Sequence, residues 1–137
     1  MHRKSIAIIL LGVVALSSAA CRKDAQISTT MAEIHAVTDE IVNKVNASPT
    51  VVGVDEAQKY WDSKKADLKS RWDNIKGARG FQVSDDAKKK WSEDYTRDFT
   101  AIKMLTVKHM GVTIRDAAFK SKLDKLVKEW EETFPLK

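Results

Sequence analysis

The sequence contains little of what would cross-link a chain or interrupt a helix. One cysteine occurs among 137 residues, so no disulfide can form within the chain and the fold must be held by packing. Only two prolines and five glycines are present, while Lys, Ala, Asp, Glu and Leu are abundant. Because these abundant residues favour helices and few positions disrupt one, the composition predicts an all-α protein.

Groups that carry out catalysis or bind metals are also scarce. Of the three histidines, one is His2, and the other two, His35 and His109, are far apart in the sequence. The sequence has no His-x₃-His pair, Cys/His cluster, haem-attachment motif or glycine-flanked serine elbow. We therefore expect no enzyme activity, no metal and no cofactor. One alternative is a haem held between Met31 and His109, as in helical-bundle b-type cytochromes.

The single cysteine follows a segment that is typical of a secretory signal. Residues 1–4 supply positive charge, residues 6–16 form an uncharged apolar run, and residues 17–20 are Ser-Ser-Ala-Ala. These small residues directly before Cys21 resemble the lipobox of bacterial lipoproteins, with Ser18 where that pattern most often has leucine. The resemblance implies that the Cys21 thiolate takes up a diacylglyceryl group, a palmitate-type lipid anchor, and that the segment before it is removed.

Two other fates of this segment stay open. The sequence Ser18-Ala19-Ala20 also fits an ordinary signal peptidase, whose action would release a soluble secreted protein with a free thiol. An uncleaved membrane anchor is the third fate, but the apolar run is shorter than the about 20 residues that a spanning helix needs.

The lipoprotein resemblance implies a location in the bacterial cell envelope, lipid-anchored and facing the periplasm. Arg22 and Lys23, rather than aspartate, follow the cysteine, which favours the outer membrane over the inner one. The chain carries a formal charge of +5, and loss of Arg3 and Lys4 with the signal leaves +3. We expect the membrane, together with an envelope protein or the cell wall, as partners, and no nucleic acid.

Apolar residues recur at helical spacing in four stretches after the signal. We predict helices over residues 30–46, 55–76, 84–110 and 114–134, separated at Pro49, at the turn 77–83 and at Gly111. In the turn, Phe81 and Val83 are expected to plug the end of the core. Four amphipathic helices with short connections predict an up-down-up-down bundle. Three helices with a long, kinked third are the alternative.

The prediction divides the chain into three parts. Residues 1–20 are the signal peptide, residues 21–28 are the lipidated N-terminus with a short polar tether, and residues 29–137 are the bundle domain. A tether of this length reaches at most about 25 Å, so the domain is expected to lie close to the bilayer.

Tryptophans and lysine runs are the remaining candidates for a site. Tryptophans 61, 72, 91 and 130 fall on or beside the apolar stripes, where they either fill the core or gather at one end as a ligand slot. Two lysine runs, Lys64-Lys65 and Lys88-Lys89-Lys90, are either solvated faces or contacts to anionic lipid or cell-wall polymer.

The resulting functional expectation is a non-enzymatic lipoprotein that acts as an interaction or structural module of the envelope. Two alternatives come from other classes of protein. One is a helical bundle that binds a small ligand, and the other is an inhibitor or immunity protein that guards the envelope against a lytic enzyme or toxin.

Overall fold

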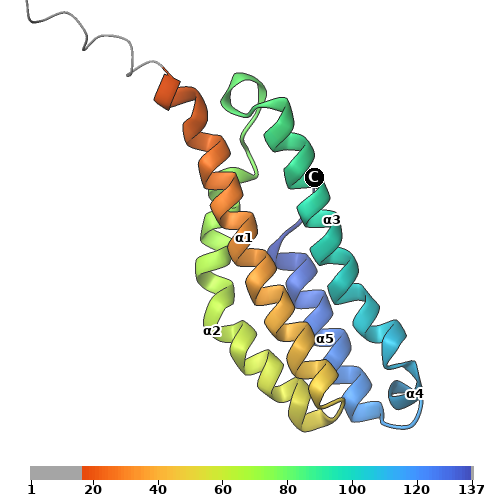
Figure 1. Cartoon of the computed structure of the whole chain (residues 1–137). Helices are drawn as coiled ribbons and strands as arrows, with labels where there is room; N and C mark the ends of the chain where they lie inside the picture. Colours follow the sequence, from red (N-terminus) through yellow and green to blue (C-terminus); the bar gives the residue numbers. More distant parts are fainter. Residues whose placement is uncertain (1–16, 137) are drawn as a thin grey trace, which may run out of the picture.

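The computed structural model describes the backbone of residues 17–136 and the side chains of residues 23–136. Over these residues it is an all-α bundle without strands, as predicted (Figure 1). Most of the predicted signal peptide, residues 1–16, lies outside the described residues. The elements are α1 (Ser17–Ala47), α2 (Val51–Ile75), the 3₁₀ turn η1 (Gly80–Gln82), α3 (Asp85–Lys108), α4 (Met110–Thr113) and α5 (Ala117–Thr133).

The long helices alternate in direction, but neighbours in sequence are not all neighbours in space. Helix α1 packs against α2 and α3, and α5 packs against the same two helices. Helices α2 and α3 therefore lie diagonally across the bundle, and residues 76–84 cross its end to connect them (Figure 1). We call this the α2–α3 end. The beginning of α1 lies there too, because Asp24 Oδ1 accepts a 3.0 Å hydrogen bond from Ser84 N.

Three helices begin at a side chain that accepts a hydrogen bond from the first turn. The accepting atoms and donors are Thr50 Oγ1 with Gly53 N at 3.3 Å, Ser84 Oγ with Ala87 N at 3.1 Å, and Asp116 Oδ1 with Phe119 N at 2.9 Å. The start predicted at Ser84 is confirmed. Helix α2 begins earlier than predicted and α5 later, because Thr50 and Asp116 supply the caps.

The predicted break near Met110 is confirmed. Helix α3 ends at Lys108, the four-residue α4 follows, and α5 starts only after Asp116. The alternative with one long third helix is therefore wrong. Gly111 sits within α4 and Ile114 follows it, so the predicted start of the last helix falls in the connection.

The structure departs from the prediction at the start of α1. Residues 21–28, expected to form a tether, are helical, and the start expected at Thr30 lies well inside the helix, where Thr30 is buried. Ile27 is 3% exposed and belongs to the core. Because Ile27, Met31 and Ile34 continue one apolar stripe, burial favours helix here over an extended leader. Little freely jointed chain therefore separates Cys21 from the bundle.

Aromatic side chains dominate the core. Trp61, Trp72 and Trp130 are at most 1% exposed. Phe134 meets their rings edge-on at centroid distances of 5.9, 5.5 and 5.0 Å, respectively. Each such contact adds about 0.5–1.5 kcal/mol beyond the area it buries. Trp61 and Trp130 are thus core residues, and Trp130 Nε1 donates to Thr38 Oγ1 at 2.9 Å.

Candidate functional site

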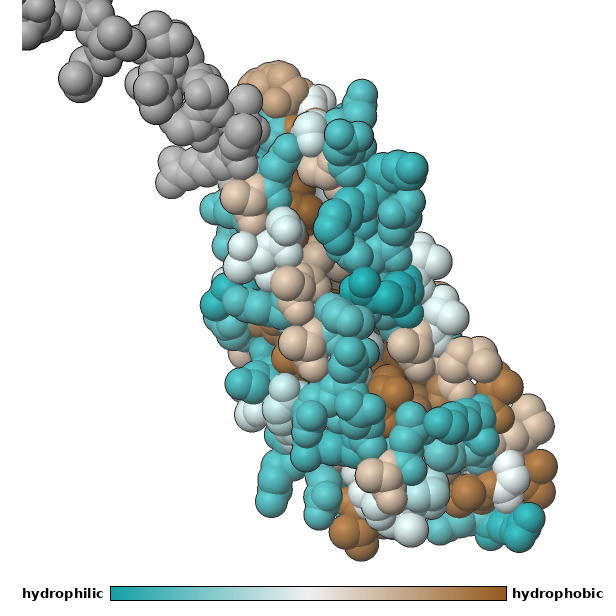
Figure 2. All heavy atoms as spheres, viewed as in Figure 1, coloured by the Kyte–Doolittle hydropathy of each residue, from teal (hydrophilic) through white to brown (hydrophobic). Residues whose placement is uncertain are grey.

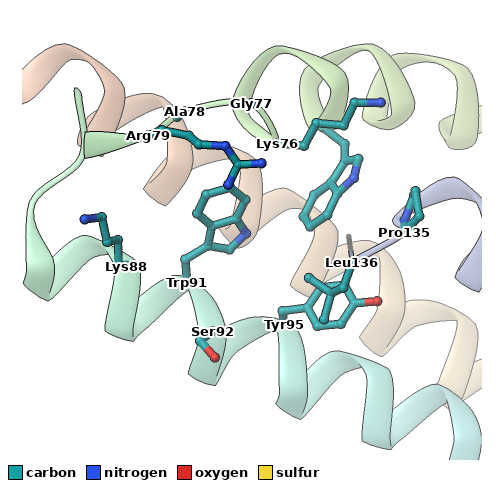
Figure 3. A pocket seen from close by; sticks show the side chains of 11 residues that line it. Lys76, Gly77, Ala78, Arg79, Lys88, Trp91, Ser92, Tyr95, Pro135 and Leu136 are labelled. Carbon is teal, nitrogen blue, oxygen red and sulfur yellow. The ribbon is translucent and has the colours of Figure 1, made fainter. Parts of the chain in front are cut away.

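A cavity of about 410 Å³ opens at the α2–α3 end of the bundle (Figure 3). It exists because α5 is short: α5 has 17 residues against 25 in α2 and 24 in α3. Pro135 follows α5, so this helix does not fill the space between the diagonal pair α2 and α3. The lining residues come from these two helices, their connection and the chain end: Trp72, Lys76, Gly77, Ala78, Arg79, Lys88, Trp91, Ser92, Tyr95, Pro135 and Leu136.

Aromatic rings form the inner wall of the cavity. Trp72 is 1% exposed and lies edge-on to Trp91 at 5.8 Å and tilted against Tyr95 at 5.6 Å between ring centroids. The Tyr95 hydroxyl donates a 2.8 Å hydrogen bond to the carbonyl oxygen of Phe134. Burial, with a smaller contribution from the Glu131 carboxylate, raises the pKa of Tyr95, so this hydroxyl stays protonated and able to donate.

Two of these rings carry buried donors that the chain does not use. The indole N–H groups of Trp72 and Trp91 are buried and have no hydrogen-bond partner among the described residues. Leaving such a donor unpaired costs about 1–3 kcal/mol. Trp61 shares this property in the core, whereas the Trp130 N–H is satisfied by Thr38. The cavity is therefore lined by apolar rings with two unused donors.

Cations surround the opening. Lys76, Arg79 and Lys88 line it from the end of α2, the connection and the first turns of α3, and Figure 3 shows the Arg79 guanidinium next to the Trp91 ring. No lining residue is acidic. Lys76 pairs with Asp73 at 2.6 Å and Lys88 with Asp85 at 3.5 Å, whereas the Arg79 guanidinium has no carboxylate partner among the described residues. The cavity thus combines an aromatic wall with a cationic rim in which Arg79 alone has no carboxylate partner among the described residues.

The first residues of α1 are fastened to this end. Besides the bond between Asp24 and Ser84, Lys23 Nζ donates to Asn74 O at 3.4 Å. Hydrogen bonds from the Ser84 side chain and backbone lower the pKa of Asp24, which keeps this exposed carboxylate ionised. Cys21 precedes Asp24 by less than one helical turn in α1, while its side chain lies outside the described residues. The predicted lipid-attachment position therefore adjoins the α2–α3 end.

Of the two hydrophobic residues in the turn that were predicted to cover the end of the core, Phe81 and Val83, only one does so. Val83 is 4% exposed and buried as expected, but the expectation for Phe81 is wrong, since its side chain is 94% exposed. Gly80 adopts φ 58°, a left-handed conformation that glycine accepts readily, and η1 then carries Phe81 outward. The end of the bundle thus presents one exposed aromatic ring, which lines a shallow hollow with Asp24, Asp85 and Lys88.

The two predicted lysine runs are not brought together. Lys64 and Lys65 lie in the middle of α2, where Lys65 pairs with Asp62 at 2.8 Å and with Glu129 at 3.4 Å and Lys64 lies over the Tyr60 ring. Lys88, Lys89 and Lys90 lie at the α2–α3 end, with ion-pair distances of 3.5 Å to Asp85, 4.0 Å to Glu93 and 2.8 Å to Asp94. Only the second run shares the end of the bundle that holds the start of α1.

A second polar cluster joins α1 to α3 away from the cavity. His35 Nδ1 lies 2.7 Å from Asp98 Oδ1, and Nε2 lies 3.2 Å from Asp39. Arg97 Nε contacts the same Asp98 oxygen at 3.2 Å. Because both imidazole nitrogens face carboxylates, neither is placed to activate a hydroxyl or thiol. This arrangement is an interhelical hydrogen-bonded cluster in which Asp98 is 1% exposed.

The pairing of Met31 with His109 considered for a haem is wrong. Met31 lies in the middle of α1, where it is buried in the core and lines a groove with Asp24 and Trp91. His109 caps the far end of α3, where its Nε2 lies 2.9 Å from Asn46 Oδ1. Within the described part of the chain, no three His, Cys, Asp or Glu side chains are grouped as metal ligands. No helix among residues 17–136 is long and apolar enough to cross a membrane.

The far end of the bundle exposes apolar side chains. Met104, Val107, Met110 and Ile114 are 48%, 54%, 53% and 78% exposed. Figure 2 shows apolar residues gathered over the region of α4. The two ends of the bundle therefore differ: one carries charged side chains of both signs and the exposed Phe81 ring, and the other carries a cluster of aliphatic and methionine side chains.

Comparison with known proteins found no match, whether to a protein-family model, to a curated protein or to a solved structure. Sequence reasoning had singled out Trp72, Trp91 and Lys88 but not Lys76, Arg79 or the exposure of Phe81. The one available signal was the Lys76-Gly77-Ala78-Arg79-Gly80 turn between two tryptophan-bearing helices, since a glycine-rich turn with two cations is poorly suited to a core.

Proposed function

We propose that this protein is a lipid-anchored, non-enzymatic module of the bacterial envelope whose α2–α3 end rests on the bilayer. The observation that carries the proposal is the fastening of residues 23–24 to Asn74 and Ser84. A lipid on Cys21 would lie about 4.5 Å along the helix from Asp24, at 1.5 Å per residue. The anchor then brings the α2–α3 connection to the headgroups of the same membrane.

Phe81 supports this orientation. An aromatic ring that is 94% exposed is costly in water but favourable at the boundary between headgroups and acyl chains. Arg79, which has no carboxylate partner among the described residues, contributes about 1 kcal/mol of attraction when it approaches anionic headgroups, whereas Lys76 and Lys89 are paired with Asp73 and Glu93. Asp85 and Asp86 begin α3 at the same end and offset part of this charge. The ring therefore contributes more to the contact than the net charge does.

The same orientation directs the apolar side chains of the far end away from the membrane. Val107 and Ile114 would face the periplasm, or the cell wall and its proteins in an outer-membrane setting. Exposed apolar groups that cluster on a small domain are characteristic of contact surfaces. This asymmetry fits an interaction module better than a protein that diffuses freely.

The first experiment tests the anchor. The intact mass of the protein extracted from its native membrane should equal residues 21–137 plus two or three acyl chains, and Cys21→Ser should abolish both the added mass and the membrane fraction. An unmodified mass in the soluble fraction would overturn the anchor.

The second experiment tests the orientation in proteoliposomes. In the lipidated protein Cys21 is blocked, so Phe81→Cys and Ile114→Cys each supply one free thiol for an environment-sensitive fluorophore. We expect the label at position 81 to shift to the blue and to be quenched by nitroxide lipids, and the label at position 114 to report water. Equal quenching at both positions, or stronger quenching at 114, would contradict the orientation while leaving the anchor intact.

A further inference from the structure

We infer that the cavity at the α2–α3 end binds a small amphipathic anion: an apolar body lodged against Trp72, Trp91 and Tyr95, with one carboxylate or phosphate at the Arg79 rim. Binding of such a ligand goes beyond the proposed anchoring function. It does not require the lipid anchor, because every residue that lines the cavity belongs to the folded domain. It concerns a ligand of the cavity, whereas the proposed function concerns which surface meets the bilayer.

The size and lining of the cavity set the apolar part of the ligand. A volume of about 410 Å³ is within the range of about 300–1,000 Å³ that small-molecule sites occupy, and toward its lower limit. Rings of Trp72, Trp91 and Tyr95 supply one wall, and Pro135 with Leu136 supplies another. A single acyl chain or a fused aromatic ring suits such a space, whereas two long acyl chains exceed it.

The charge of the lining sets the polar part. Three of the lining side chains are cationic and none is anionic. The Arg79 guanidinium, exposed at the rim, has no partner among the described residues that would compete with a ligand. A planar guanidinium forms paired hydrogen bonds with a carboxylate or phosphate, and such charge-assisted bonds are about twice as strong as neutral ones. A cationic ligand would be repelled by the same rim.

The unused indole donors indicate acceptor atoms on the ligand. Trp72 and Trp91 both line the cavity, and the N–H of each is buried without a partner among the described residues. These groups donate only, so an oxygen of the ligand, and not an N–H, is the complement that they lack. Trp61 in the core also has an unpaired indole N–H, so the donors of Trp72 and Trp91 add a preference for acceptor atoms to a site that the cavity and the Arg79 rim define.

The experiment uses sodium decanoate as the probe and the protein from residue 21 with Cys21→Ser, which retains every core residue from Ile27 to Phe134. Each of the four tryptophans gives one indole N–H resonance in a proton–nitrogen correlation spectrum. Decanoate should move the resonances of Trp72 and Trp91 in a saturable manner. Those of Trp61 and Trp130, which do not line the cavity, should stay in place. Decyltrimethylammonium, with the same chain and the opposite charge, should move none of them.

Two matched variants separate specific binding from general affinity for apolar molecules. Arg79→Ala should weaken decanoate binding about fivefold to tenfold, the loss of one charge-assisted contact. Arg115→Ala removes an exposed arginine from the far end of the bundle and should leave binding unchanged. Because both positions are exposed, neither change should unfold the protein. The inference is overturned if decanoate moves no indole resonance, moves all four alike, or binds the Arg79 variant as tightly as the parent.

Discussion

The hydrogen bond between Trp130 and Thr38 allows a quantitative test of the packing. Trp130 and Thr38 are both 0% exposed, and the indole N–H donates to Thr38 Oγ1 at 2.9 Å across the bundle. Thr38→Val replaces the hydroxyl by a methyl group of similar size and keeps the β-branched shape. The change therefore removes the acceptor without opening a cavity.

The magnitude follows from the orphaned donor. A buried N–H that loses its partner costs about 1–3 kcal/mol, and the methyl group recovers part of this through burial. We expect the free energy of unfolding to fall by about 1.5 kcal/mol. With a urea dependence of about 1–3 kcal/mol/M for a small domain, the unfolding midpoint should fall by about 1 M.

The assay is urea unfolding followed by tryptophan fluorescence, with Thr29→Val as the control. Thr29 lies on the same helix, is exposed and makes no side-chain hydrogen bond to the described residues, so the same substitution there changes propensity but not burial. The Trp130 indole resonance should also move in Thr38→Val. If the two variants were equally stable, or the resonance stayed in place, the account of this buried contact would be refuted.

Three further predictions concern a glycine, a histidine and the exposed ring. A Cβ on Gly53 would lie 1.9 Å from Ser48 O, so Gly53→Ala should destabilise the fold by about 2 kcal/mol. A Cβ on Gly111 would have no neighbouring atom within 4 Å, so Gly111→Ala should stabilise the fold by about 0.5–1 kcal/mol. The melting temperature should therefore fall in Gly53→Ala and rise in Gly111→Ala. Burial, and secondarily the charge of Lys108, lowers the pKa of His109 below its ordinary value of 6.5. As the pH decreases through 6.5, the unfolded chain therefore takes up a proton before the folded chain does, and the free energy of unfolding falls. His109→Gln should flatten this part of the dependence of stability on pH, which urea titrations at several pH values measure. Phe81→Ser should leave the melting temperature nearly unchanged, because a surface change is worth about 0.5 kcal/mol or less, while it should weaken binding of the soluble domain to anionic vesicles in a flotation assay.

Much of the helical architecture was predictable because local rules and burial agreed. The apolar stripes that contain Trp61 and Trp91 lie within α2 and α3, and the third helix starts at Ser84 as predicted. The predictions were wrong where the local sequence pattern and the burial of a side chain favoured different conformations. At the start of α1, the polar character of residues 22–26 favoured a leader, but Ile27 is buried against the core and extends the helix.

The candidate site was predictable only in its parts. The sequence shows that Trp72 stands near the end of one helix and Trp91 near the start of the next. It does not show that these helices lie diagonally, or that α5 stops before it fills the space between them. For the same reason Phe81 was expected inside, since a hydrophobic residue in a turn gives no sign of its direction until the conformation of Gly80 is known.

The sequence by itself determined that this chain is helical and that, with a single cysteine, it is held by packing without an internal disulfide. These follow from composition, periodicity and order along the chain, which need no knowledge of distant contacts. The tertiary structure alone decided that the start of α1, the cationic turn and the aromatic cavity share one end of the bundle. That juxtaposition depends on which helices pack side by side and on how far each one reaches. Both are set by the mutual burial of side chains far apart in the sequence, as between Thr38 and Trp130.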